Sequence, residues 1–449
     1  GQTAVTYTYD NANRLTQVQQ GTSTVTLAYD NADRRTSLTL PNSNSVTSAY
    51  NAASELTTLT YKKGATVLGD LTYTYDAAGN RIKTGGTFAR SGLPPALTTT
   101  SYNANNQQTT FGTNTETYDL NGNLNMVTDA GVTATYTWNA RNQLAGITTT
   151  GFSASFSYDS FGRRTGRTVQ GVVTNFVYDG LNPVQEKAGA TVTANLLTGL
   201  GIDEFFTRTD GVGSRALLPD ALGSTVALGD STGTLQTQYT YEPFGYATQT
   251  GLATTNSYKY TGREDDGSGL DYYRARYYHP RLQRFIEEDP IGFGGGDVNL
   301  YAYVNGNPLT FIDPLGLRVL NPDNYPISPT VIAALWELNR LIGCDKDIMI
   351  TGGDRNPDST LGAGSTSSHT LGIAADIKVP GQLHLQMSNQ AAASGLFGGV
   401  GWYQEGYRGP HGEGPHTHVD LRFFPARWGY PASGPPMRGY FPSYPARLN

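Results

Sequence analysis

The stretch VTYTYDNANRLTQV, Val5–Val18, contains the pattern that decides the fold of this chain. Alternating residues lead into the dipeptide Tyr9-Asp10, and a turn and a second polar strand follow it. An aspartate at the start of a turn can accept backbone N–H groups, and Asn or Gly in the turn tolerates a positive φ. The stretch therefore predicts a strand–turn–strand unit.

The same unit recurs along the chain. A Tyr or Trp followed by Asp or Asn occurs nine times, at spacings of 16 to 27 residues. The aromatic positions are Tyr9, Tyr29, Tyr50, Tyr75, Tyr102, Tyr118, Trp138, Tyr158 and Tyr178. One hairpin cannot bury a face but a stack of hairpins can, and we expect each ring to pack on the ring of the next unit. The alternative is a β-sandwich in which these pairs recur by coincidence.

These units resemble the tyrosine-aspartate (YD) repeats of the Rhs family. The segments Pro219–Gly251 and Tyr258–Leu317, which include GREDDGSGLDYYRARYYHPRLQRF, resemble the Rhs-associated core. The resemblance implies a mainly β fold, with YD repeats over 1–218 and the core over 219–317. In the family, the repeats coil into a β-shell of antiparallel strands that encloses a toxic C-terminal domain. This chain has fewer repeats than a complete shell, so it would form its closing end or a smaller open one.

Two Asp-Pro pairs in the core carry possible chemistry. Asp289 and Asp313 lie 24 residues apart in the frames DPIG and DPLGL. The resemblance implies that they act as an aspartic-protease-like pair, one as base and one as acid, which cuts the chain after Leu317. The alternative is that each Asp-Pro only starts a turn. Glu288 stands where some relatives carry an arginine.

The composition changes after Leu317, and we expect a separate domain over 318–449. Ser328–Gly343 predicts a helix with Ser328 as its N-cap and an apolar stripe that includes Trp336. A short strand, DIMITGG, and a Gly/Ser-rich loop follow.

Histidine and carboxylate residues gather in two stretches of this domain. SSHTLGIAADIKV contains His369 and Asp376, and GPHTHVDLRFF contains His416, His418 and Asp420. Strand-like alternation places the last three on one face. The chain has only six histidines. A set of two histidines and one carboxylate suits a catalytic zinc ion with one open coordination position.

Residues 318–449 resemble the M15 family of zinc peptidases, the D-Ala-D-Ala carboxypeptidase group. The matching motifs are ITGGDRNP, SSHTLGIAADI, GGVGWY, HVDLR and RWG, in that order. The resemblance implies a small α+β fold with a central antiparallel sheet, like the Hedgehog signalling domain. It also implies hydrolysis of peptide bonds in peptidoglycan stem peptides.

Carried over by position, the resemblance assigns roles to individual residues. His369, Asp376 and His418 would hold Zn²⁺. Arg355 would bind a substrate carboxylate or peptide carbonyl, and His416 would stabilise the oxyanion.

The chain departs from the M15 pattern at one position. Many members have a general base three residues before the last zinc ligand, where this chain has Pro415. Glu413 lies three residues before His416 instead. Either His416 is the ligand and Glu413 the base, or His418 is the ligand and the base lies elsewhere. The HVD frame favours His418, Glu413 remains the best carboxylate for the base, and Asp420 would orient a ligand.

Composition excludes several classes of protein. The formal net charge is −6, and only a modest basic cluster lies between Arg274 and Arg284, which argues against nucleic-acid binding and a nuclease. The single cysteine, Cys344, allows no internal disulfide. No apolar run is long enough to span a membrane. The opening GQTAVTYTYD is not a signal peptide, so we expect a piece of a longer protein or export by another route.

Together these features predict a polymorphic-toxin fragment, an exported bacterial effector that is secreted or at the cell surface. Its β-shell would carry a zinc peptidase against competitor cell walls, and the producer would need an immunity protein. The alternative is a β-shell scaffold whose C-terminal domain binds zinc or cell wall without catalysis.

Overall fold

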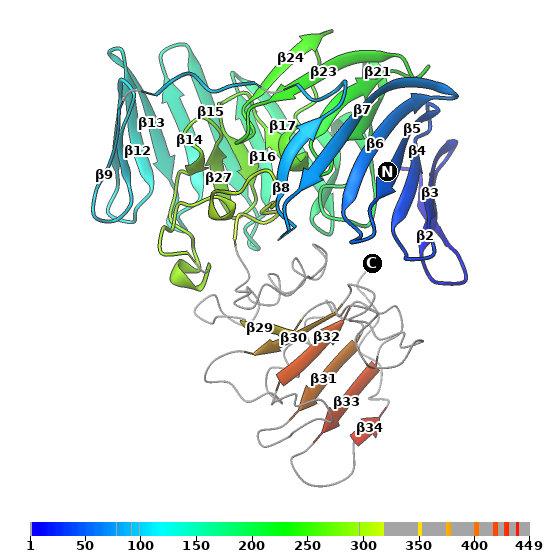
Figure 1. Ribbon diagram of the computed structural model, residues 1–449. Helices are drawn as coiled ribbons and strands as arrows, with labels where there is room; N and C mark the ends of the chain where they lie inside the picture. Colours follow the sequence, from blue (N-terminus) through cyan, green and yellow to red (C-terminus); the bar gives the residue numbers. More distant parts are fainter. Residues whose placement is uncertain are drawn as a thin grey trace. The chain divides into compact units, whose positions relative to one another are not determined.

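The structure is a computed structural model in which the chain divides into two compact units (Figure 1). The first contains Gly1–Glu288 and Tyr301–Gly316, and the second contains Asp289–Leu300 and Leu317–Asn449. The described residues are 2–77, 79–90, 92–97, 99–295, 297–317, 349–352, 374–378, 399–403, 416–420, 426–430 and 437–439. Among them, no helix has the length and apolar character needed to cross a membrane.

The first unit is mainly antiparallel β-structure, which confirms the predicted fold class of the repeat region. Eight strands in chain order form one sheet: β1 (Val5–Tyr9), β2 (Leu15–Gln20), β3 (Ser23–Tyr29), β4 (Arg35–Thr39), β5 (Asn44–Tyr50), β6 (Leu56–Lys63), β7 (Thr66–Tyr75) and β8 (Arg81–Gly85). Each strand pairs with the one before and the one after it, so the sheet is a series of hairpins.

A second sheet of sixteen strands repeats this order. Its strands are β9 (Thr100–Tyr102), β10 (Gln108–Phe111), β11 (Asn114–Tyr118), β12 (Leu124–Asp129), β13 (Val132–Trp138), β14 (Leu144–Thr149), β15 (Phe152–Tyr158), β16 (Arg164–Val169), β17 (Val172–Asp179), β18 (Asn182–Ala188), β19 (Thr191–Thr198), β20 (Phe205–Asp210), β21 (Gly213–Pro219), β22 (Thr225–Gly229), β23 (Leu235–Tyr241) and β24 (Ala247–Gly251).

The turn of each YD unit has the predicted capping geometry. Asp10 Oδ1 accepts the N–H groups of Ala12 and Arg14, both at 2.9 Å, and Asn13 has a φ of 61°. The same pair of bonds recurs at Asp30, Asn51, Asn103, Asp119, Asn139 and Asp159, and also at Asp220 and Asp230. The last two have no aromatic residue before them, so the dipeptide pattern missed them.

The expected contact between rings of successive units is wrong. Rings of successive units lie two strands apart, about 9.5 Å, beyond the 4.5–7 Å range of ring pairs. Instead, the polar ring atom donates to a backbone carbonyl of the preceding unit in six of the nine units, as from the Tyr29 hydroxyl to Leu15 (2.9 Å) and from Trp138 Nε1 to Leu124 (2.8 Å). The Arg14 guanidinium lies over the Tyr29 ring at 5.2 Å and fills the space between units.

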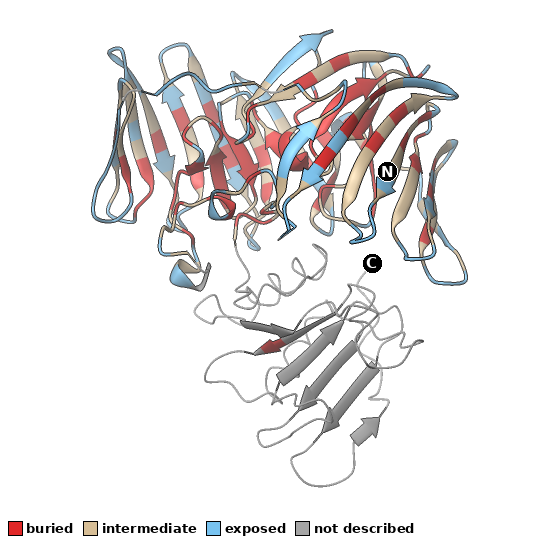
Figure 2. Ribbon diagram, in the orientation of Figure 1, coloured by how far each residue is buried: buried red, intermediate tan, exposed pale blue. Residues whose placement is uncertain are grey.

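The inner faces of the two sheets pack against each other. Apolar residues of β2–β4 form one cluster with Leu197, Phe206 and Ala216 of the second sheet. Polar bonds join the same faces, as from Asn44 Nδ2 to the Gly233 carbonyl at 2.9 Å. Figure 2 shows the buried positions as red segments along the strands. Buried and exposed positions alternate, as along β15, so the outer face carries the polar residues.

The rest of the first unit, residues 256–288 and 301–316, is called the core segment here. It contains η1 (Tyr260–Gly262), η3 (Val304–Gly306) and a small antiparallel sheet of β25 (Glu264–Asp265), β26 (Asp271–Tyr273), β27 (Arg276–His279) and β28 (Arg284–Phe285). Leu270, Tyr272, Tyr277 and Ile286 pack on the inner face of β12–β16. The core segment therefore covers the part of the second sheet that the first sheet leaves open.

The described part of the second unit contains η2 (Gly292–Gly295) and one six-stranded sheet, in the order β29-β30-β32-β31-β33-β34. The strands are β29 (Met349–Gly352), β30 (Ala374–Lys378), β31 (Gly399–Tyr403), β32 (His416–Asp420), β33 (Ala426–Tyr430) and β34 (Met437–Gly439). All neighbours are antiparallel except β31 and β33. The helix predicted at 328–343 lies outside the described residues, so the α+β class of this unit stays a prediction.

Candidate functional site

Asp313, one of the two predicted cleavage residues, begins a tightly held segment of the first unit. Its side chain is only 3% exposed, and its Oδ2 lies 3.5 Å from Nη2 of Arg276. Arg276 itself is 1% exposed, and its guanidinium stacks 3.6 Å from the centroid of the Phe285 ring. A buried carboxylate is costly without a cationic partner, and Arg276 provides one for Asp313.

The carbonyl groups of the three residues after Asp313 all accept hydrogen bonds from residues between 263 and 276. The Pro314 carbonyl accepts from Arg263 and Arg274, and the Leu315 carbonyl accepts the Ala275 N–H at 3.0 Å. The Gly316 carbonyl accepts from Arg276 Nε at 2.5 Å. Arg274 and Ala275 form the turn between β26 and β27, and Arg276 is the first residue of β27. The backbone is therefore fixed up to the residue before Leu317.

Gly316 is required by this arrangement. Its φ is +66°, and an added Cβ would lie 2.4 Å from the Tyr273 carbonyl oxygen and 3.0 Å from the Arg276 nitrogen. Both neighbours are backbone atoms that cannot move aside, so a larger residue would displace the segment.

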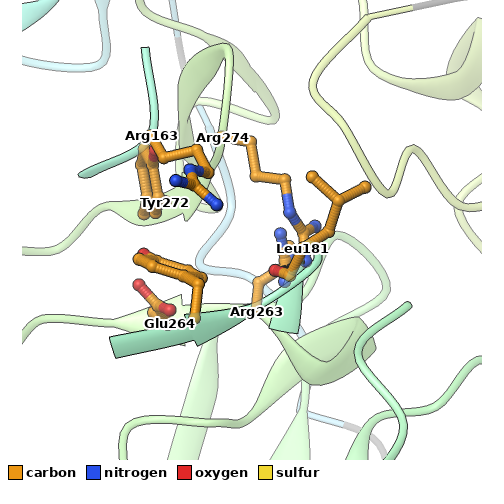
Figure 3. A pocket seen from close by; sticks show the side chains of 7 residues that line it. Arg163, Leu181, Arg263, Glu264, Tyr272 and Arg274 are labelled. Carbon is orange, nitrogen blue, oxygen red and sulfur yellow. Dashed lines mark hydrogen bonds between the residues drawn. The ribbon is translucent and has the colours of Figure 1, made fainter. Parts of the chain in front are cut away.

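Two of these arginines share one aspartate. Asp203 accepts from both Arg263 and Arg274, and Arg274 also donates to the Leu181 carbonyl at 3.0 Å. Burial, together with the neighbouring Arg274 charge, lowers the pKa of Arg263 to about 9. The side chains of Arg163, Arg263, Arg274 and Glu264 line a small pocket here with Tyr178, Leu181 and Tyr272 (Figure 3).

A second buried ion network joins the repeats to the core segment. Arg164 of β16 pairs with Glu264 and Asp266, and Arg167 pairs with Asp266. Burial by itself raises the pKa of Asp266, but the two guanidinium groups outweigh it and hold the pKa below its usual value. This network joins the core segment to β16 of the second sheet.

Asp289, the other predicted cleavage residue, belongs to the second unit. It is 6% exposed, its Oδ1 accepts the Ile291 N–H at 3.0 Å, and its own N–H donates to the Leu300 carbonyl at 3.0 Å. This is the geometry of a turn-starting aspartate, which was the alternative interpretation. The adjacent Glu288 accepts the Tyr301 hydroxyl at 3.3 Å. The proton-sharing role of the two aspartates stays a prediction.

Sequence analysis did not single out Glu287, a further buried carboxyl beside this site. Its Oε1 accepts the Tyr277 N–H at 2.7 Å. Burial raises its pKa well above the usual value, against the opposing effects of the Tyr277 N–H and Arg276. Its place in RFIEEDP, between two apolar residues and the first Asp-Pro, was the available signal.

Strand pairing in the second unit places some of the predicted metal-site residues opposite each other. Asp376 of β30 and His418 of β32 are register partners, so they occupy one face of the sheet. Alternation places His416 and Asp420 on that same face, opposite Tyr403 and Ala374 respectively. His369, Arg355 and Glu413 lie outside the described residues. The pairing brings together two of the three predicted ligands.

Comparisons with known proteins place the first unit. The Teneurin YD-shell family model matches residues 40–293. Toxin subunit YenC2 of Yersinia entomophaga is 32% identical over 130 residues, which are 27% of this chain and 13% of that protein. The tRNA nuclease WapA of Bacillus subtilis (strain 168) is 39% identical over 104 residues, 22% of this chain and 4% of that protein.

A solved structure has the same fold. The crystal structure of TcdB2-TccC3-Cdc42 aligns with a TM-score of 0.52 and 20% identity over 70% of this chain and 20% of that chain. The chain thus spans only a small part of its relatives' length. The family model, however, covers more than half of the 449 residues, and the hairpin meander with its capped turns agrees with it. The chain therefore belongs to the Teneurin YD-shell family.

Proposed function

We propose that this chain is the carrier part of a polymorphic toxin, which cuts its own chain after Leu317 and so frees a C-terminal effector domain. The observation that carries this proposal is the buried Asp313 carboxylate, held four residues before that bond in a segment whose next three carbonyls are all fixed. Relatives named as a toxin subunit and as a tRNA nuclease support the toxin context.

The reaction is hydrolysis of the Leu317–Arg318 peptide bond by one carboxylate and one carboxylic acid, Asp289 and Asp313. The carboxylate takes a proton from water, and the water oxygen attacks the Leu317 carbonyl carbon. The carboxylic acid gives its proton to the Arg318 nitrogen as the C–N bond breaks. The products are a Leu317 carboxylate and an Arg318 amino group, and no cofactor is consumed.

Intact-mass analysis of the purified full chain tests this proposal. We expect a fragment that begins at Arg318, and we expect Asp313→Asn and Asp289→Asn to remain uncut. A wild-type chain that stays whole over days, or variants that are cut at the wild-type rate, would refute self-cleavage.

For the effector domain we propose a zinc peptidase that acts on peptidoglycan stem peptides. The pairing of Asp376 with His418 supports this proposal, because the strand register places an aspartate and a histidine opposite each other, and zinc prefers donors of these two residue types. With His369 they would hold Zn²⁺, which when bound lowers the pKa of a water molecule. Arg355 would bind the substrate carboxylate, His416 would stabilise the oxyanion, and Glu413 would accept the proton.

Digestion of purified peptidoglycan by the full chain, followed by mass analysis of the products, tests the peptidase. We expect peptide release that stops with a chelator and with His369→Ala. Cell-wall binding that persists in chelator without any product would support the non-catalytic alternative. Cleavage of tRNA instead would assign a nuclease, as in the name of WapA.

The partners follow from this assignment. We propose that the complete protein has more YD repeats, that its shell encloses the effector domain, and that the protein is exported towards competitor bacteria. An immunity protein in the producing cell would block the effector. Co-expression of the full chain with its neighbouring open reading frame, with growth as the readout, tests this point.

A further inference from the structure

Residues in and beside the turn between β26 and β27 bind the backbone that follows Asp313, and the proposed acid–base roles of Asp289 and Asp313 do not explain these contacts. Arg274, Ala275 and Arg276, together with Arg263, bind the backbone of Pro314–Gly316, and these four residues are called the carbonyl clamp. Three successive carbonyls accept hydrogen bonds from the carbonyl clamp. The guanidinium groups of Arg263 and Arg276 are buried, and a segment that only formed a turn would not require them, because each one is costly to desolvate.

We propose that Arg276 is a positioning residue for self-cleavage, which sets the bond that is cut by holding the Asp313 carboxylate and the Gly316 carbonyl at once. This inference rests on the proposed self-cleavage. Nη2 of Arg276 lies 3.5 Å from Asp313 Oδ2, and its Nε lies 2.5 Å from the Gly316 oxygen. One rigid, planar group therefore links the acid–base residue to the backbone next to the bond.

The Arg276 side chain is itself held in one position. It is 1% exposed, and the Phe285 ring lies 3.6 Å from its guanidinium carbon. A guanidinium locked by stacking and by two acceptors loses no further freedom when the reaction begins. Such preorganisation is the means by which proximity accelerates a reaction, and a displacement of about 1 Å can cost about 100-fold in rate.

The segment 314–316 cannot shift by one residue along the carbonyl clamp. Only glycine fits at position 316, where a Cβ would lie 2.4 Å from the Tyr273 oxygen. The Pro314 carbonyl is held separately by Arg263 and Arg274. Since Leu317 follows Gly316 directly, its carbonyl lies one peptide unit beyond a fixed point.

A consequence concerns the cut end. Every contact of the carbonyl clamp with Asp313–Gly316 is made within the first unit, so cleavage after Leu317 removes none of them. The new carboxyl end should therefore stay bound to the carbonyl clamp, while the effector domain is free to leave.

Arg276→Lys in the full chain tests the proposal, because lysine keeps the charge but cannot donate from two fixed atoms. We expect cleavage at least about tenfold slower, and fragments with mixed first residues around Arg318 by mass spectrometry. The matched control is Arg281→Lys, since Arg281 also pairs with a carboxylate and covers a ring but lies outside the carbonyl clamp. It should cut at the wild-type rate and position.

Gly316→Ala is the second variant, and it decides the matter if Arg276→Lys fails to fold, as judged by its melting curve. It displaces the Gly316 carbonyl while it keeps the chemical groups of Arg276 and Asp313, and we expect the same slowing. If the folded variant is cut at the wild-type rate and its fragment begins only at Arg318, the proposed role of Arg276 is wrong. This holds even if Asp313→Asn remains uncut. If Asp313→Asn is cut like the wild type, the self-cleavage proposal itself fails.

Discussion

At the residue scale, the YD unit is defined by one side-chain oxygen. In Asn139, Oδ1 accepts the N–H groups of Arg141 at 2.8 Å and Gln143 at 3.1 Å, while the Asn139 N–H donates to the Gln143 carbonyl. The positive φ of Asn142, 56°, closes the turn. The aromatic residue before it contributes a hydrogen bond to the preceding unit rather than a stacked ring. Asp or Asn is therefore the essential half of the dipeptide, which is why Asp220 and Asp230 need no aromatic partner.

This interpretation predicts the effect of changing the cap. Asn139→Ala should lower the free energy of unfolding by about 1 to 2 kcal/mol, because two backbone N–H groups lose their acceptor. Asn139→Asp keeps the acceptor and should cost much less. Urea unfolding followed by circular dichroism measures both. Equal losses in the two variants would contradict the role of Oδ1.

At the element scale, side chains on the inner face of the strands decide how the sheets and the core segment combine. Arg164 of β16 is completely buried and pairs with Glu264 and Asp266 of the core segment. The backbone N–H of Arg164 also donates to the Tyr272 hydroxyl at 3.1 Å. Such ion pairs specify where the core segment lies along the sheet more than they stabilise it.

Glu116 of β11 predicts a pH dependence of stability. It is 4% exposed, and burial raises its pKa to about 7, although Arg284 and the Tyr118 hydroxyl oppose this effect. The raised pKa means that the folded protein keeps a proton that the unfolded chain releases above about pH 4.5. Stability therefore falls as the pH rises from about 4.5 to about 7, by on the order of 3 kcal/mol.

Glu116→Gln, which cannot ionise, should remove this decline. Urea unfolding of the wild type and the variant at several pH values between 4 and 8 measures the difference. The same slope in both proteins would show that Glu116 is not its source.

At the scale of the whole molecule, the two compact units have different chemistry. The first unit is held by apolar clusters and buried ion pairs, and among the residues with described side chains no group of three or more His, Cys, Asp or Glu residues is placed to hold a metal ion. The second unit contains the strands with Asp376 and His418. If the second unit binds zinc as proposed, the metal ion should stabilise that unit.

Zinc titration of the full chain is expected to raise the melting temperature of one of two thermal transitions. Binding stabilises a folded state by an amount that rises with the logarithm of ligand concentration over Kd, so the shift should grow with zinc and vanish with a chelator. His418→Ala should abolish the shift and leave the other transition unchanged. A shift that His418→Ala does not alter would place the metal elsewhere.

Several features of the chain followed from the sequence alone. The strand–turn–strand units, their turns and the mainly β class depend on contacts between residues at most a few positions apart, as in the Asp10 turn. The strands that contain Asp376 and His418 could also be predicted, because alternation is local.

Only the tertiary structure decided how distant segments meet. The ring-to-ring contacts were predicted wrongly because sequence spacing does not show that successive units lie two strands apart. Leu15 and Phe206 share one apolar cluster, and Arg276 donates a hydrogen bond to Gly316. No periodic pattern in the sequence records that these segments meet. Burial is set by the whole chain at once, so the charges of Glu116, Glu287 and Arg263 became interpretable only when the fold had placed them away from water.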